Sequence, residues 1–414
     1  MNASPTRIRG YVIVGIALLC LFIVLGWVAF HEERSPLDQQ PVKVETVKPV
    51  VPVLEPVENP ANKRTAGQTD GSASTNAAAI YRQAFDLFDQ FSKDQEFILG
   101  DWRTNVDASV EAELCDRLRP ICDLMHQAAA VTNCDWGIEP ITVGTRLPHL
   151  QASRNIARAA LWNAVHCRSN DMAGATDDTL AVLRLGHNIS HSGLLGCLTD
   201  HGLQGLAAAC VADNVGLLGG ADVQQLAAAL NDPAYGEAAS QAMYQDADRL
   251  DRYATELSTM RAAQAEKEFS DSAQIMAQFG EGYPTHLDQA AIVSAYKQNA
   301  DSERELAEAL ATSSEAAYEN WQQHATELET SDPLAKSMME TAESFVQRAR
   351  YAEVDRALVV AGMAVAQGGV DTLPSNPDPS SSQPFVYTQT ANGFQLQSTY
   401  QVNGKPMTMQ FKLR

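Results

Sequence analysis

The chain has 414 residues, a formal net charge of −21 and a hydrophobic fraction of 45%. This fraction is enough for a buried core, and the length is typical of two or three domains. The acidic balance disfavours nucleic acid as a partner, because phosphate binding needs clustered lysine and arginine, and it equally disfavours electrostatic docking on anionic lipid.

An uncharged apolar segment predicts a single transmembrane helix over residues 11–30. At 1.5 Å per residue this segment spans about 30 Å, the thickness of the hydrocarbon core of a membrane. Arg7 and Arg9 precede the segment and acidic residues follow it. By the positive-inside rule, residues 1–10 lie in the cytoplasm and the rest of the chain lies outside. The run is too long for a cleaved signal peptide, so we expect a signal anchor in the cytoplasmic (inner) membrane.

The next segment, residues 31–75, has the composition of a linker. Its first half is rich in proline, which favours a semi-stiff extended chain, and its second half is rich in glycine and serine, which favours flexibility. Beyond it, the pattern predicts a helical domain with cysteines over 76–220, a long-helix region over 221–371 and a β-meander over 372–414.

Apolar residues at helical spacing predict the helices of residues 76–220. The predicted segments are Tyr81–Phe91, Val110–Ala128, Leu147–Asn170, Ala175–Ser190 and a helix after Gly193 that Gly219-Gly220 ends near Leu218. Pro120 falls inside the second segment, so we expect a kink or a break there. Further on, Asp232-Pro233 and Asp332-Pro333 are typical helix starts. We expect long helices after both, a break near 280–284, and an end of the last helix near Gln367.

A switch to period-two alternation predicts three strands after residue 372. Apolar residues such as Phe394, Leu396 and Phe411 alternate with glutamine, threonine and lysine. Asn392-Gly393 and Asn403-Gly404 are strong signals for tight hairpin turns. We therefore expect a three-stranded antiparallel meander with one apolar face, covered by the helix just before it.

Six cysteines outside the anchor suggest up to three disulfides in an extracytoplasmic domain. They are Cys115, Cys122, Cys134, Cys167, Cys197 and Cys210. Cys115 and Cys122 are about 10.5 Å apart in a straight helix, and Cys197 and Cys210 about 20 Å apart, so neither pair can bond. Any bridge must join different helices. The alternative is that some are buried free thiols.

Three histidines form a candidate metal site. His187 and His191 are four residues apart on one helical face, and His201 follows beyond Gly193. A His-x-x-x-His pair is able to hold a metal, but the fuller H-E-x-x-H pattern is absent. Ordinary helix histidines are the favoured interpretation, and the sequence names no cofactor.

Short motifs in the helical domain and in the tail resemble those of a known protein family. They are Cys134-Asp135-Trp136-Gly137, Leu147-Pro148-His149-Leu150, Arg154-Asn155-Ile156-Ala157-Arg158, Leu183-Arg184-Leu185-Gly186-His187, Leu373-Pro374, Asp378-Pro379, Pro384-Phe385-Val386-Tyr387 and Gly393-Phe394-Gln395-Leu396. Over residues 76–220 and 345–402 the chain resembles a family of uncharacterised bacterial envelope proteins. The resemblance implies an N-terminal anchor, a helical body and a short C-terminal β module similar to the tail of some pseudopilins. It implies no activity, and the pilin-type processing motif is missing.

The sequence thus predicts a mainly α, single-pass membrane protein with an extracytoplasmic helical bundle. We expect a non-enzymatic binding or scaffolding role in the cell envelope, with an envelope protein or the cell wall as partner. One alternative is a metal-dependent hydrolase using His187, His191 and His201. Another is a pseudopilin-like accessory of a secretion system.

Overall fold

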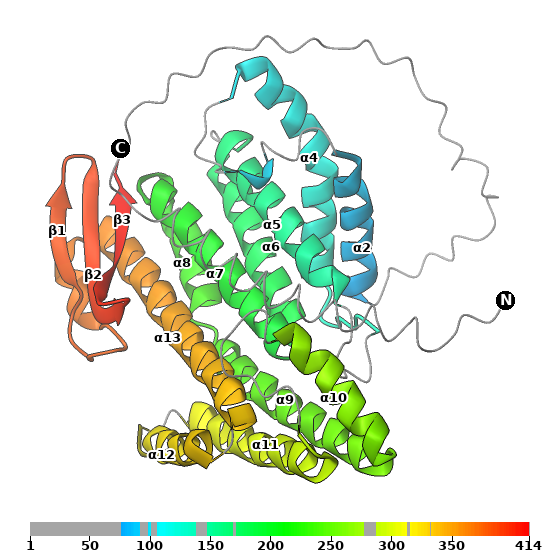
Figure 1. Ribbon diagram of the computed structural model, residues 1–414. Helices are drawn as coiled ribbons and strands as arrows, with labels where there is room; N and C mark the ends of the chain where they lie inside the picture. Colours follow the sequence, from blue (N-terminus) through cyan, green and yellow to red (C-terminus); the bar gives the residue numbers. More distant parts are fainter. Residues whose placement is uncertain are drawn as a thin grey trace, which may run out of the picture.

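The computed structural model describes residues 76–91, 98–100, 106–137, 147–168, 171–276, 287–312, 315–331 and 333–413. In these ranges the protein is mainly helical, with a small antiparallel sheet at the C-terminal end (Figure 1). The predicted anchor, the predicted linker and the predicted break near 280–284 lie outside the described residues. Among the helices described, none has the length and apolar character needed to cross a membrane.

The helices of the N-terminal half follow the predicted apolar stripes. They are α2 (Ala77–Phe88) with η2 (Asp89–Phe91), α4 (Ala108–Ala129), α5 (Pro148–His166), α6 (Met172–Ser190), α7 (Leu194–Asn214) with η3 (Val215–Leu217), and α8 (Gly220–Leu230). The sequence predicted a kink or a break at Pro120. Helix α4 continues through this residue, so no break occurs there. Leu118 and Ile121 are buried on either side of the proline, and their burial offsets its lost hydrogen bond.

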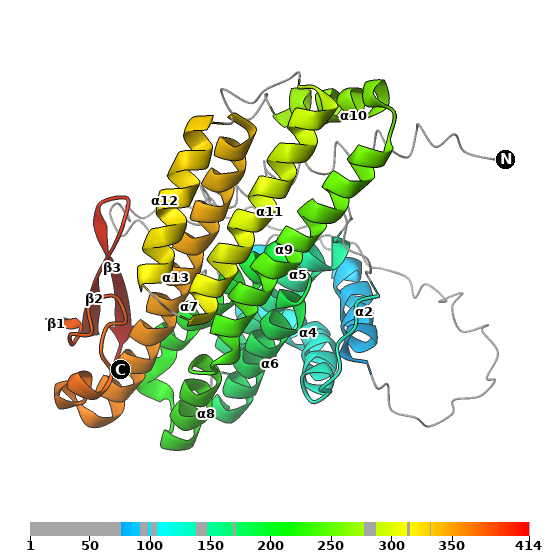
Figure 2. The same cartoon turned by 90° about the horizontal axis from the view of Figure 1, so that it is seen from below.

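The helices of the C-terminal half are longer and form a second bundle (Figure 2). They are α9 (Ala234–Thr259), α10 (Ala262–Met276), α11 (Gln289–Thr312), α12 (Glu315–Ser331) and α13 (Pro333–Gly368), followed by η4 (Val370–Ser375). The helix starts predicted at Pro233 and Pro333, and the end predicted near Gln367, are confirmed to within one residue. Helices α9 and α11 pack along each other, and α12 joins α11 to α13.

Helix α13 takes part in both halves of the hydrophobic core. Its C-terminal part, with Leu358 and Met363, belongs to a core shared with α2 to α8 and the sheet. Its N-terminal part, with Phe345, packs with Leu306 of α11 and Trp321 of α12. The long helix therefore packs against both bundles.

The C-terminal meander is confirmed. Strands β1 (Val386–Thr390), β2 (Gly393–Val402) and β3 (Lys405–Lys412) pair antiparallel in that order. The buried face carries the predicted residues Phe394, Leu396, Met407, Met409 and Phe411. Their polar neighbours Thr408, Gln410 and Lys412 are exposed.

One of the two predicted hairpin turns is displaced. Asn403 and Gly404 have φ values of 52° and 73°, the left-handed pair expected of an Asn-Gly turn. In the first hairpin, however, the turn is at residues 391–392 and Gly393 belongs to β2. A Cβ at Gly393 would lie 1.9 Å from the carbonyl oxygen of Phe411. This glycine is thus required for the close approach of β3 and not for the turn.

The sheet packs on α7 as well as on the preceding helix α13. Lys412 Nζ lies 2.8 Å from Asp213 Oδ1 of α7, and the hydroxyl of Tyr400 donates to the carbonyl of Gln347 in α13. The ring of Phe411 lies against Gly362, where an added Cβ would be 2.1 Å from ring carbons. A glycine in the C-terminal third of α13 therefore lets the ring of Phe411, and with it the sheet, lie close to this helix.

We expect Gly362→Ala to lower the free energy of unfolding by about 1–3 kcal/mol, because the new methyl group overlaps the buried Phe411 ring. Urea unfolding of the detergent-solubilised full-length chain measures this. Gly202→Ala in α7 is the matched control, since no atom lies within 4 Å of its added Cβ. The control should be neutral or gain up to about 1 kcal/mol of helix propensity. Equal effects of the two substitutions would contradict the close packing of Phe411 against Gly362.

Candidate functional site

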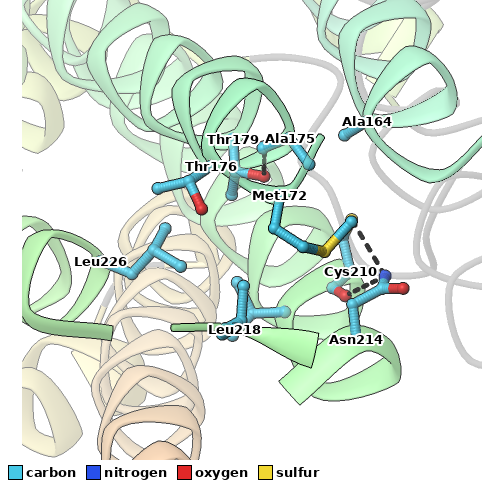
Figure 3. A pocket seen from close by; sticks show the side chains of 10 residues that line it. Ala164, Met172, Ala175, Thr176, Thr179, Cys210, Asn214, Leu218 and Leu226 are labelled. Atoms are coloured by element: carbon cyan, nitrogen blue, oxygen red, sulfur yellow. Dashed lines mark hydrogen bonds between the residues drawn. The ribbon is translucent and has the colours of Figure 1, made fainter. Parts of the chain in front are cut away.

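A small cavity lies between α5, α6, α7 and α8 (Figure 3). Its volume is about 20 Å³, and Met172, Thr176 and Cys210 are among its lining residues. Asn214 closes one side and donates its amide to the carbonyl of Cys210 at 2.9 Å. A volume of this size holds about one water molecule, so this cavity is a packing gap and not a substrate site.

A larger cavity of about 530 Å³, which we call the α6 groove, lies along one face of α6. Helix α4 forms one wall and the junction of α8 with α9 forms the other. Its lining residues are His126 and Ala129 of α4, Asp177, Leu180, Ala181, Leu183, Arg184 and His187 of α6, Ala229 of α8, and Asp232 and Tyr235 at the start of α9. This volume is within the usual range for small-molecule sites, and polar groups converge on an apolar floor.

Residues of α6 form the floor of the groove, and their helical spacing brings them to one face of the helix. Asp177, Arg184 and His187 are separated by seven and three residues, which places them on one face. The helix starts at Asp171, whose carboxylate accepts from the N–H of Gly174 at 3.1 Å. Across the groove, the carboxylate of Asp232 accepts from the N–H of Ala234, the first residue of α9, at 3.0 Å. The floor and the α8–α9 wall each contain a helix start that is fixed by an aspartate.

His126 is held in place by a buried carboxylate behind the groove. Its Nε2 lies 2.9 Å from Oδ1 of Asp178, whose side chain is fully buried. Asn163 donates to the other carboxylate oxygen at 2.6 Å, and Arg168 lies 3.8 Å from it. The interaction with Asp178 raises the pKa of His126. The imidazole thus has one fixed orientation at the groove wall.

Arg184 is the central charged group of the groove. Its Nε is buried and has no hydrogen-bond partner. Among the described residues, no carboxylate lies within ion-pair distance of its guanidinium group. A buried polar atom without a partner costs about 1–3 kcal/mol, so this guanidinium is a candidate ligand-binding group.

His187 and His191 lie side by side, as their spacing predicted. Their rings are 5.2 Å apart and edge to face. Burial, the neighbouring His191 and the charge of Arg184 lower the pKa of His187, and burial followed by Arg184 lowers that of His191. Both imidazoles are therefore neutral at pH 7, the form that binds metal ions.

The third predicted metal ligand, His201, has different neighbours. Its Nε2 lies 3.6 Å from the sulfur of Cys197, and its ring stacks on Phe345 of α13. Burial and nearby arginines lower the pKa of His201 to about 3. Within the described ranges, no group of three or more histidine, cysteine or acidic side chains is arranged to hold a metal ion. The structure thus supplies the His187–His191 pair and no third ligand beside it.

A buried polar network lies behind the groove. The guanidinium of Arg356 in α13 lies 4.7 Å from the ring centre of Tyr235 and donates to Oε1 of Gln204 in α7 at 2.5 Å. Asp200, one helical turn before Gln204, is 1% exposed and lies against Gly186 of α6. Burial raises the pKa of Asp200 to about 7. The network links the groove residue Tyr235 to α7 and α13.

One disulfide is present among the candidate cysteines. Cys115 of α4 is bonded to Cys167 at the end of α5, so the bridge joins two helices as the spacing required. The other four, Cys122, Cys134, Cys197 and Cys210, are free thiols. Burial raises the pKa of Cys122, Cys134 and Cys197, which makes these thiols poor nucleophiles at neutral pH.

Several groove residues had no role in the sequence-based predictions. Arg184 was named only as part of a short motif, and His126, Asp178 and Tyr235 were not singled out. A signal did exist for Asp178 and for Asp200, because each is an acid on the apolar face of its helix. Buried acids of this kind mark sites that deserve a test.

No family model, curated protein or solved structure matches the chain. The resemblance to envelope proteins therefore stays a prediction from the quoted motifs.

We expect Asp200→Asn to change how stability depends on pH. The folded protein holds a proton on Asp200 up to about pH 7, whereas the unfolded chain releases it near pH 4. The free energy of unfolding of the wild type should therefore fall relative to the variant as pH rises from 4 to 7. The change is on the order of 4 kcal/mol and levels off above pH 8. Urea unfolding at pH 4, 5.5, 7 and 8.5 measures it, and parallel profiles would contradict the assignment.

Proposed function

We propose that the chain is a single-pass protein of the cytoplasmic membrane whose residues 76–413 form an extracytoplasmic, non-enzymatic binding domain. The binding site is the α6 groove. The observation that supports this most strongly is Arg184, a basic side chain that lines a groove of about 530 Å³ and has no ion-pair partner among the described residues. A ligand with an acidic or acceptor group would pair with this guanidinium.

The walls of the groove favour binding because they are fixed before a ligand arrives. His126 is held by Asp178, Tyr235 is stacked under Arg356, and Asp232 is tied to the first turn of α9. Groups that are already ordered lose little conformational entropy on binding. This arrangement supports a role in recognition.

The compartment is supported by the chemistry of the cysteines. A disulfide such as Cys115–Cys167 persists in oxidising compartments and is rare in the bacterial cytoplasm. This agrees with an anchor at 11–30 that leaves the helical domain outside, as the charges at its ends predict.

A metal-dependent hydrolase is the second candidate, favoured by the His187–His191 pair. Two neutral imidazoles whose ring centres are 5.2 Å apart, one of them lining the groove, are compatible with metal binding. Metal content of the purified full-length protein, compared with a His187→Ala, His191→Ala double variant, separates the two candidates. If the wild type holds about one metal ion per chain and the double variant holds none, the hydrolase becomes the preferred function.

We expect at least one small polar compound to stabilise the wild type in an Arg184-dependent manner. A thermal-shift panel of amino acids, short peptides, sugars, nucleotides and polyamines on the detergent-solubilised full-length chain measures this. Arg184→Gln should weaken the binding of the stabilising compound by about tenfold or more, because the substitution removes a charged hydrogen-bond donor. Arg119→Gln on the exposed surface of α4 is the control. Equal responses of Arg184→Gln and wild type, or no response in either, would refute the groove as the site.

We expect the Cys115–Cys167 bridge to form only when residues 11–30 are present. Cells are treated with an alkylating reagent before lysis, and the two cysteines are mapped by mass spectrometry without reduction. The full-length chain should yield the linked peptides, and a variant lacking 11–30 should yield alkylated thiols, since its domain would stay in the reducing cytoplasm. Alkylated thiols in the full-length chain would place the domain in the cytoplasm.

A further inference from the structure

The opposite charges of the α6 groove do not pair with one another. Arg184 on α6 and Asp232 at the α8–α9 junction both line it, yet neither has an ion-pair partner among the described residues. Both charges act on the same two groups, the imidazole of His187 and the hydroxyl of Tyr235. A positive group on the floor and a negative group on the α8–α9 wall therefore lie near the same part of the groove.

The floor next to these charges is apolar and ends in a second acid. Leu180 and Ala181 lie one turn before Arg184 on α6, and Ala129 of α4 lines the same space. Asp177 lies seven residues before Arg184, about 10.5 Å along the helix axis. A molecule that is complementary to the groove therefore carries two opposite charges close together and a chain of atoms that lies along this apolar floor.

We propose that the α6 groove binds a free α-amino acid, with its carboxylate on Arg184 and its ammonium group on Asp232. This rests on the proposed function, because it names the ligand class of the same groove. A guanidinium group binds a carboxylate through two parallel N–H donors, and the guanidinium of Arg184 lines the groove. Asp232 uses Oδ1 for the N–H of Ala234, which leaves Oδ2 for an ammonium group.

The side chain of the amino acid lies along Leu180 and Ala181 towards Asp177. The neighbouring His126 is already paired with Asp178, so the charge of Asp177 is the unpaired one at that end. A side chain with a methylene stem and a cationic tip fits this floor, whereas an acidic side chain meets repulsion. We therefore expect L-lysine to bind more tightly than L-glutamate.

Isothermal titration of the full-length protein in detergent tests the proposal with L-lysine, Nα-acetyl-L-lysine and L-lysine amide. Each derivative lacks one of the two head charges, and each should bind the wild type about 10–100-fold more weakly than L-lysine. Asp232→Asn should lose affinity for L-lysine by a similar factor and lose little more for the acetylated derivative. Arg184→Gln should show the same pattern with the amide. Such non-additivity assigns each charge to its own partner.

Asp222→Asn is the matched control, because Asp222 caps α8 through the N–H of Gly219 but does not line the groove. It should bind L-lysine like the wild type. Wild-type affinity of Asp232→Asn for L-lysine, or tighter binding of L-glutamate, would overturn the proposal. Arg184-dependent binding of a sugar or nucleotide without amino-acid binding would overturn it and leave the proposed function standing. No Arg184-dependent ligand of any class would overturn both.

Discussion

The enclosure of helix α7 is the constraint on which the rest of the structure depends. Apolar or small residues lie on every face of this helix of 21 residues, and such a helix has to be covered on all sides. Helices α5, α6, α9 and α13 and strand β3 all contact it. Because these elements come from both bundles and from the sheet, the burial of one helix fixes the mutual positions of the parts. The packing of Phe411 against Gly362 is a consequence, since it lets the sheet lie close enough to cover the end of α7.

The polar residues of α7 are the exceptions to this apolar character, and they connect the core to the groove. Gln204 accepts from Arg356, and Thr199 accepts from Arg154 of α5. The guanidinium of Arg356 in turn lies over the ring of Tyr235, which lines the groove. Burying such groups costs free energy unless each is paired. The carboxylate of Asp200, Nδ1 of His201 and Nε2 of Gln204 are buried without a hydrogen-bond partner, so the fold carries this cost in the part of α7 behind the groove.

How far the sequence predicts this structure depends on whether the relevant interactions are local. Helix positions and the meander follow from periodicities within single segments, and Asn403-Gly404 follows from backbone preferences of two residues. Gly393 was assigned to the wrong role because the carbonyl of Phe411 that demands it lies 18 residues further on. The groove residues come from three separate segments, so no local pattern could group them. His201 was grouped with His187 by closeness in sequence, but Gly193, with φ of 76°, starts a new helix that carries it to Cys197 and Phe345.

The unpaired state of Arg184 is informative because of the charge of the whole chain. With 51 acidic and 30 basic residues, carboxylates are in excess, and a basic side chain near several of them would be expected to pair. Asp177 and Asp232 share the groove with Arg184 and still leave it unpaired. The walls of the groove are supported from behind, at His126 by the carboxylate of Asp178 and at Tyr235 by the guanidinium of Arg356. A ligand that enters between the walls and carries both charges satisfies the guanidinium without moving either wall, and this is why a dipolar molecule fits the groove better than a simple anion.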